Sequence, residues 1–99
     1  MFTGIIEDIG VIAAIEKKSG SWVFVVKTSF EPGSVREGDS VSVDGVCLTA
    51  TAIRGQTFSV DASLETLRLT TLKDKTPGQK VNLERAMAAD GRFGGHIVT

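Results

Sequence analysis

The sequence has little of several features that would point to particular classes of protein. Its one cysteine, Cys47, cannot form an internal disulfide, so nothing indicates an oxidising compartment and we expect a cytoplasmic protein. The apolar runs at residues 2–6 and 22–26 are far shorter than a membrane helix, which needs about 20 residues, and the first is too short for a signal peptide. We therefore expect no membrane partner.

An excess of one charge is also lacking. The chain has 11 Lys and Arg residues against 12 Asp and Glu residues, and no segment concentrates the basic ones. A small nucleic-acid-binding barrel needs a basic groove with exposed aromatic side chains, so the composition argues against nucleic acid as a partner. An apolar fraction of 41% over 99 residues is typical of a single globular domain, and the balanced charge is compatible with a neutral, polar small molecule as ligand.

What the chain does contain is organised around a predicted hairpin over residues 40–49. Asp44-Gly45 is a strong signal for a two-residue turn, because glycine adopts positive φ freely and aspartate tolerates it. Folding the arms back pairs Val43 with Val46, Ser42 with Cys47, Val41 with Leu48 and Ser40 with Thr49. Side chains alternate along a strand, so the apolar pairs share one face and the polar pairs share the other. The polar face is a candidate site, although a solvent-facing strand also favours serine and threonine.

Further strands are predicted on both sides of this hairpin. Alternating apolar residues and turn signals indicate strands over residues 9–15, 21–27, 57–62 and 80–84, and extend the second hairpin arm to residue 53. At Ser63 the period changes: this residue can cap a helix of one or two turns, with Glu65 in the first turn. Six short strands predict an all-β, antiparallel six-stranded barrel with one short helix, because closing the sheet removes exposed edges.

Five motifs resemble riboflavin synthase. They are MFTGII at residues 1–6, DGVCLT at 44–49, ETL at 65–67, VNLER at 81–85 and FGGH at 93–96. Their combination and order are specific, whereas each motif alone is weak. The resemblance covers the whole chain but only the amino-terminal half of a usual family member. It implies a lumazine-binding domain over residues 1–99, in which the glycine-rich stretch 87–99 runs into the linker to a second barrel.

The resemblance also implies an architecture and a reaction. The barrel would be a Greek-key barrel, one of two in tandem, and the full-length enzyme would be a trimer. Each barrel would bind one 6,7-dimethyl-8-ribityllumazine, and a four-carbon unit would pass between two lumazines to give riboflavin, without a metal or an organic cofactor. This transferase reaction needs two barrels, so we expect this half to be weakly active or inactive and to pair as a homodimer. A non-catalytic lumazine or flavin carrier is the alternative function.

The resemblance further implies a substrate-binding site. A flat heterocycle with a polyol chain is best held by backbone groups at its edge, apolar contacts on its faces and polar groups around the polyol. The residues implied are Gly4, Ile5, Ile6, Ala62, Ser63 and Leu64 at the ring edge, Cys47, Leu48 and Thr49 at the pocket floor, and Glu65 and Thr66 at the ribityl chain. We expect the polar hairpin face to line an interior edge of the barrel.

Cys47 and Ser40 are the candidate catalytic residues. A thiol is mostly protonated at neutral pH, so a nucleophilic role needs an activating neighbour, and no basic residue is adjacent in the hairpin. Ser40 and Thr49 could instead position a water molecule or the substrate. The alternatives are that Cys47 is a small buried core residue and that Glu65 is merely a helix-start acid. His96, the only histidine, could be a general base, but we expect it near the domain junction.

Overall fold

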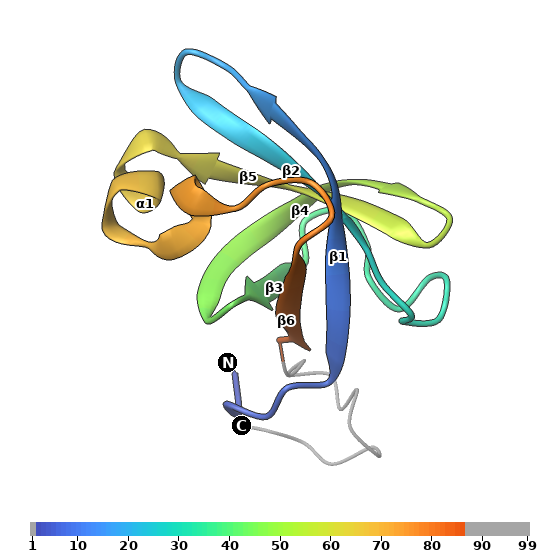
Figure 1. The fold of residues 1–99 in the computed structure, drawn as a ribbon. Coiled ribbons are helices and arrows are strands. Elements are labelled where there is room, and N and C mark those ends of the chain that lie inside the picture. The colour runs from blue at the N-terminus through green and yellow to red at the C-terminus, as the bar shows by residue number, and fades with distance from the viewer. Residues whose placement is uncertain (1, 87–99) are drawn as a thin grey trace.

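In the computed structural model, which describes residues 2–86, the chain forms a closed antiparallel barrel with the strand order β1-β2-β5-β4-β3-β6 (Figure 1). The strands are β1 (Asp8–Lys17), β2 (Ser21–Lys27), β3 (Ser40–Val43), β4 (Val46–Arg54), β5 (Thr57–Ser63) and β6 (Lys80–Arg85). The predicted six-stranded barrel with one short helix is confirmed. The glycine-rich stretch 87–99, with the FGGH motif and His96, lies outside the described residues.

The hairpin of β3 and β4 forms with the predicted register. The paired residues are Ser40 with Thr49, Val41 with Leu48, Ser42 with Cys47 and Val43 with Val46. Asp44 and Gly45 have φ values of 50° and 83°, as a two-residue turn with positive φ at both positions requires. The Asp44 carboxylate accepts the Asn82 N–H at 2.7 Å and lies 2.9 Å from the Lys75 ammonium. The turn is therefore tied to β6.

The interior of the barrel is filled by apolar side chains. On β5 the alternation works as predicted, since Phe58, Val60 and Ala62 are buried. The other fully buried side chains include Ile12, Phe24, Val26, Val41, Val43, Leu72, Val81 and Leu83. A barrel of this size is only wide enough for its own side chains, so a ligand site belongs on the outer surface or at an end.

The helix α1 (Leu64–Leu69) begins at the predicted cap and is followed by a 3₁₀ turn, η1 (Thr71–Asp74), that the sequence did not predict. The Ser63 hydroxyl accepts the Thr66 N–H at 3.1 Å, which satisfies one of the free amides of the first turn. Leu67 and Leu72 are buried and join the barrel core, so this segment packs against the end of β5 (Figure 1). Within residues 2–86 no helix has the length and apolar character to span a membrane.

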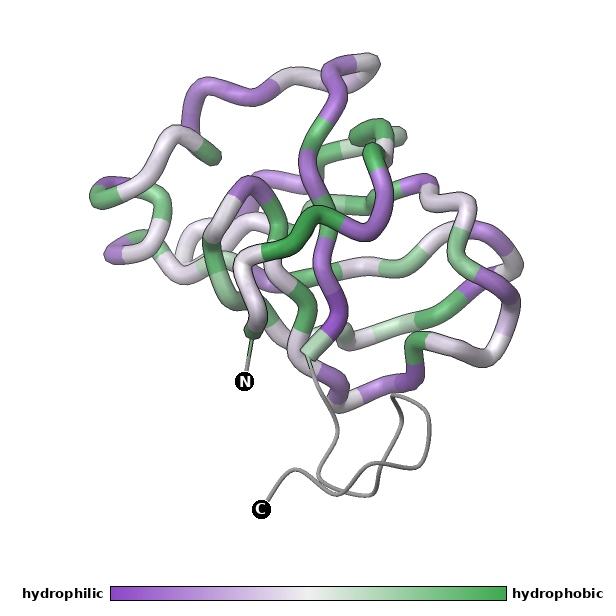
Figure 2. The backbone as a smooth tube through the Cα atoms, turned by 90° about the horizontal axis from the view of Figure 1, so that it is seen from below, coloured by the Kyte–Doolittle hydropathy of each residue, from purple (hydrophilic) through white to green (hydrophobic). Residues whose placement is uncertain are grey.

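The amino-terminal segment, residues 2–7, is named here the arm. Seen from below, the arm runs across the barrel, and it contains a strongly hydrophobic stretch (Figure 2). Ile5 and Ile6 are 67% and 55% exposed. Large apolar side chains that remain this exposed side by side are candidates for contact with a ligand or a partner.

Candidate functional site

A pocket of about 300 Å³ opens between the arm and strands β3 and β6. Its lining residues are Phe2, Gly4 and Ile6 of the arm, Ser42 and Gly45 of the hairpin, and Asn82, Leu83 and Glu84 of β6. This volume is at the small end of the range for small-molecule sites. A second hollow, beside Phe30 and Ile53, has only about 10 Å³, which holds one water molecule at most. The arm pocket is therefore the candidate ligand site.

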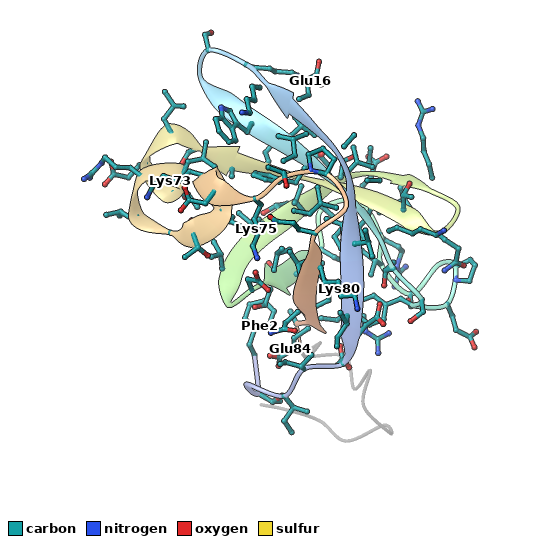
Figure 3. All side chains as sticks on the ribbon, viewed as in Figure 1. Phe2, Glu16, Lys73, Lys75, Lys80 and Glu84 are labelled. Atoms are coloured by element: carbon teal, nitrogen blue, oxygen red, sulfur yellow. The ribbon has the colours of Figure 1, made fainter. Side chains whose placement is uncertain are left out.

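The arm is held against the barrel by the end of β6. The Glu84 carboxylate accepts hydrogen bonds from the Thr3 N–H, from the Thr3 hydroxyl at 2.7 Å and from the Gly4 N–H at 3.1 Å. Its neighbour Arg85 pairs with Glu7, with Nε 3.0 Å from Oε1. Phe2 and Glu84 both line the pocket, and in Figure 3 they lie near the lower end of β6, with the arm running below it. One wall of the pocket thus depends on contacts between residues about 80 positions apart.

Gly4 occupies a backbone position that suits glycine. Its φ is +83°, while nothing lies within 4 Å of where a Cβ would be. The need for glycine here comes from the backbone conformation, not from close packing within the chain. The missing side chain leaves the backbone open to a molecule in the pocket.

The outer surface beside the pocket carries a polar stripe. It consists of Ser40, Ser42, Cys47, Thr49, Asp61 and Glu84, which are joined by the strand pairings Ser42–Glu84, Ser42–Cys47, Ser40–Thr49 and Thr49–Asp61. Directly paired residues have Cβ atoms about 4.5–5.5 Å apart on one face of the sheet. Cys47 and Thr49 are therefore one strand away from Ser42, which lines the pocket.

The expectation that this polar face lines the barrel interior is wrong. Cys47 and Thr49 are exposed, whereas Val41, Val43 and Leu48 on the opposite face are buried in the core. In so small a barrel the apolar face fills the interior, and the polar face must point outward. The exposure of Cys47 also rules out its alternative as a buried core residue.

The predicted site residues at the junction of β5 and α1 form a separate group. Ala62 is fully buried and can offer a ligand only backbone groups, as can Leu48 on β4, which is nearly buried. Ser63 is engaged as the helix cap, and the exposed Glu65 carboxylate lies 2.6 Å from Arg68. Leu64 is half exposed and Thr66 is partly buried. The arm pocket brings together Gly4 and Ile6 with Ser42, but its lining does not extend to this group.

Five lining residues escaped the sequence reasoning: Phe2, Gly45, Asn82, Leu83 and Glu84. The sequence offered one signal, the acid in the VNLER motif. In the structure this residue, Glu84, lies on the outward face of β6 yet is only 7% exposed. Such burial shows only when the arm is placed on the strand. Among residues 2–86, no group of three or more His, Cys, Asp or Glu side chains is arranged to hold a metal ion.

Two comparisons of sequence relate the chain to known proteins. A family model described as the lumazine binding domain matches residues 3–86. Riboflavin synthase of Bacillus subtilis (strain 168) is 50% identical over 99 residues, which are 100% of this chain and 46% of that protein. Riboflavin synthase of Actinobacillus pleuropneumoniae is 48% identical with the same coverage. The chain thus spans about half the length of the curated relatives it matches.

Solved structures show the same similarity. LumP complexed with 6,7-dimethyl-8-(1'-D-ribityl) lumazine superimposes with a TM-score of 0.80 at 30% identity, over 87% of this chain and 49% of the LumP chain. LumP complexed with riboflavin gives a TM-score of 0.80 at 28% identity, over 99% of this chain and 56% of that chain.

Proposed function

The chain belongs to the lumazine-binding domain family, and from this premise we propose that it is the amino-terminal domain of a riboflavin synthase. In this proposal the domain binds 6,7-dimethyl-8-ribityllumazine or riboflavin at the arm pocket. The observation that carries the proposal is the 50% identity to a riboflavin synthase over the whole chain, which includes the arm. Residues 87–99 then lead into the linker to a second barrel, and the protein works in the cytoplasm.

The pocket offers the groups that such a ligand needs. The backbone carbonyls of Gly4, Ile5 and Ile6 and the N–H of Ile6 can pair with the edge of the ring, and Phe2 and Ile6 provide apolar surface for its faces. The Ser42 hydroxyl adds a polar group at the pocket wall. The ring edge would extend over Cys47, Leu48 and Thr49, with the ribityl chain directed toward residues 62–66 at the start of α1.

An open pocket leaves one side of the ligand uncovered, and this suggests where a second barrel belongs. The exposed Ile5 and Ile6 lie beside the opening and offer apolar contact to a facing domain. In the full-length enzyme this domain would be the second barrel of another subunit in a trimer, and for this chain alone a second copy in a homodimer. Two lumazines would then face each other, as a transfer of four carbons between them requires.

Cys47 and Ser40 are the residues that we propose for the chemistry. The Cys47 thiol is exposed on the polar stripe, so a ligand over the stripe can reach it. Ser40 pairs with Thr49, two residues along the strands from the pair of Ser42 and Cys47, and these two hydroxyls can position a water molecule or the substrate. A non-catalytic carrier is not favoured, because the curated relatives that match the whole chain are riboflavin synthases.

The test is a titration of the purified chain with riboflavin, followed by the fluorescence of the ligand. We expect a saturable change for the wild type and binding at least about tenfold weaker for Ser42→Leu, which fills the pocket. Ser19→Leu makes the same chemical change in the exposed loop between β1 and β2 and should bind like the wild type. No fluorescence change at high micromolar riboflavin would contradict the proposal.

A second measurement separates the enzyme from the carrier. The full-length protein that contains this domain is incubated with 6,7-dimethyl-8-ribityllumazine, and riboflavin formation is followed by absorbance. The proposal predicts turnover by the full-length protein. Tight binding of the lumazine without any riboflavin formation would identify a carrier instead.

A further inference from the structure

We infer that Glu84 is a positioning residue of the binding site: its carboxylate fixes the backbone of Thr3 and Gly4 so that the arm forms a wall of the pocket. This inference rests on the proposed function, because it assigns a role in ligand binding to a residue that holds the arm. Glu84 acts through the arm, and it need not touch the ligand.

The contacts of the carboxylate show that it and the arm depend on each other. It accepts the N–H and the hydroxyl of Thr3, and the Gly4 nitrogen lies 3.1 Å from one of its oxygens and 3.2 Å from the other. Glu84 is 7% exposed, and a buried carboxylate is costly unless its oxygens receive hydrogen bonds. Within residues 2–86 the side-chain hydrogen bonds of Glu84 all come from the arm. Removing the arm therefore leaves the Glu84 carboxylate uncompensated, whereas removing the carboxylate leaves Thr3 and Gly4, both exposed, without the contacts that hold them to β6.

The hydrogen bonds that Glu84 accepts fix the arm at Thr3 and Gly4, and Gly4 lines the pocket. Farther along, the Glu7 N–H donates to the Leu83 carbonyl at 2.8 Å, and Arg85 pairs with the Glu7 carboxylate. Between these two anchors, Ile5 and Ile6 project from the surface. The arm is thus an arch held at both ends by consecutive residues of β6; the lining residue Gly4 is held directly by Glu84, and the lining residue Ile6 directly precedes the Glu7 anchor.

Loss of the carboxylate should release this end of the arch. Glutamine has the same size, but it carries no charge, and its NH2 group in the place of Oε1 would face the Gly4 N–H, which is itself a donor. Hydrogen bonds to a charged acceptor are roughly twice as strong as neutral ones. When the binding-competent arrangement is only fractionally populated, the apparent affinity falls by that fraction. We expect Glu84→Gln to bind riboflavin about tenfold or more weakly.

The first experiment compares riboflavin binding and amide exchange in three proteins: wild type, Glu84→Gln and Glu16→Gln. Glu16 lies on β1, far from the arm in Figure 3, and its side chain is 68% exposed, so it undergoes the same change of charge without loss of the arm contacts. We expect affinity to fall only in Glu84→Gln, together with faster hydrogen exchange at Thr3 and Gly4. Unchanged affinity in Glu84→Gln would overturn the inference.

A second pair of variants separates positioning from direct contact and does not depend on the folding of Glu84→Gln. Thr3 does not line the pocket, but its hydroxyl donates to Glu84. Thr3→Val removes this hydrogen bond and should weaken riboflavin binding, whereas Thr3→Ser keeps the hydroxyl and should preserve it. Equal affinity of both variants, or weak binding by Glu84→Gln with Thr3 and Gly4 still protected, would show that Glu84 does not act through the arm.

The two proposals fail in different ways. If the wild type does not bind riboflavin, the proposed function is wrong and the ligand role of Glu84 falls with it. The exchange rates of Thr3 and Gly4 in Glu84→Gln still report whether the carboxylate holds the arm. If the wild type binds and Glu84→Gln binds equally well, the function stands and the positioning role is refuted.

Discussion

Gly10 provides a direct test of how the barrel closes. It lies on β1 opposite Val81 of β6, at the seam where the first and last strands pair. A Cβ at this position would lie 2.6 Å from Leu83 Cδ1, 2.8 Å from the Lys27 carbonyl oxygen and 3.0 Å from Val26 Cγ1. The leucine side chain can rotate away, but the carbonyl belongs to the backbone of β2. Gly10→Ala therefore forces a shift of paired strands.

The cost of this change can be worked out from the contacts. Overpacking a filled core by one methyl group costs about 1–3 kcal/mol, which exceeds the roughly 0.4–1 kcal/mol that alanine gains over glycine through the unfolded state. In a domain of this size 1 kcal/mol corresponds to roughly 4–8 °C in Tm, so we expect Tm to fall by about 5–15 °C. Urea unfolding followed by the fluorescence of Trp22, the only tryptophan, measures the free energy.

Gly20→Ala is the matched control for this prediction. Gly20 lies between β1 and β2, where nothing is within 4 Å of the position that an added methyl group would take and φ is not in the left-handed region. The same substitution there should leave the free energy of unfolding unchanged or raise it slightly. If Gly10→Ala is as stable as Gly20→Ala, the seam between β1 and β6 is not packed as described.

Three further predictions concern the helix cap, a surface acid and the thiol. Ser63→Ala should lower the free energy of unfolding by about 1 kcal/mol in urea titrations, because the Thr66 N–H loses its acceptor; an unchanged value would argue against the cap. Burial raises the pKa of Asp8, but hydrogen bonds from Ser29 and Thr28 outweigh it and hold that pKa below its ordinary value. Because the pKa is lower in the folded state, the ionised carboxylate stabilises the fold at pH values above the unfolded-state pKa, and this stabilisation is lost as the pH falls through the folded-state pKa. Between about pH 6 and about pH 2, Asp8→Asn should therefore lose less of its free energy of unfolding than the wild type loses. An equal loss in the two proteins would refute this role of Asp8. In the proposed full-length riboflavin synthase, Cys47→Ser should lower turnover far more than riboflavin affinity, because serine is a much poorer nucleophile; equal losses would limit the thiol to the pocket wall.

The elements that were predicted correctly are those with local signals. Asp44-Gly45 fixed the hairpin register, Ser63 marked the start of α1, and the apolar alternation of β5 identified its buried face. Each of these signals acts over a few residues, where turn geometry, capping and side-chain alternation determine the structure.

On β1 the same reasoning identified the strand but not its buried face. The alternating Ile9, Val11 and Ile15 are at least partly exposed, whereas Gly10 and Ile12 face the core. The pairing with β2 shifts register between residues 12 and 14, so a strict alternation cannot hold along the whole strand. Such an irregularity depends on the partner strand and is not encoded in the local pattern.

The site was predictable only in part, for a related reason. The pattern separated a polar hairpin face from an apolar one, but the position of the pocket depends on the arm, whose contacts with Glu84 span 80 or 81 residues. No local period signals such a contact. Of the residues expected at the ligand, the structure brings Gly4 and Ile6 to the pocket, and Cys47 and Thr49 to the neighbouring stripe.

The most direct test of the central claim, that the ligand lies outside the barrel beneath the arm, is to map amide chemical shifts while riboflavin is added to the isotopically labelled chain. We predict the largest changes at Gly4, Ile6, Ser42 and Cys47, with little change in the loop at residues 18–20. Changes centred on the hollow beside Phe30 and Ile53, with the arm unaffected, would contradict the claim.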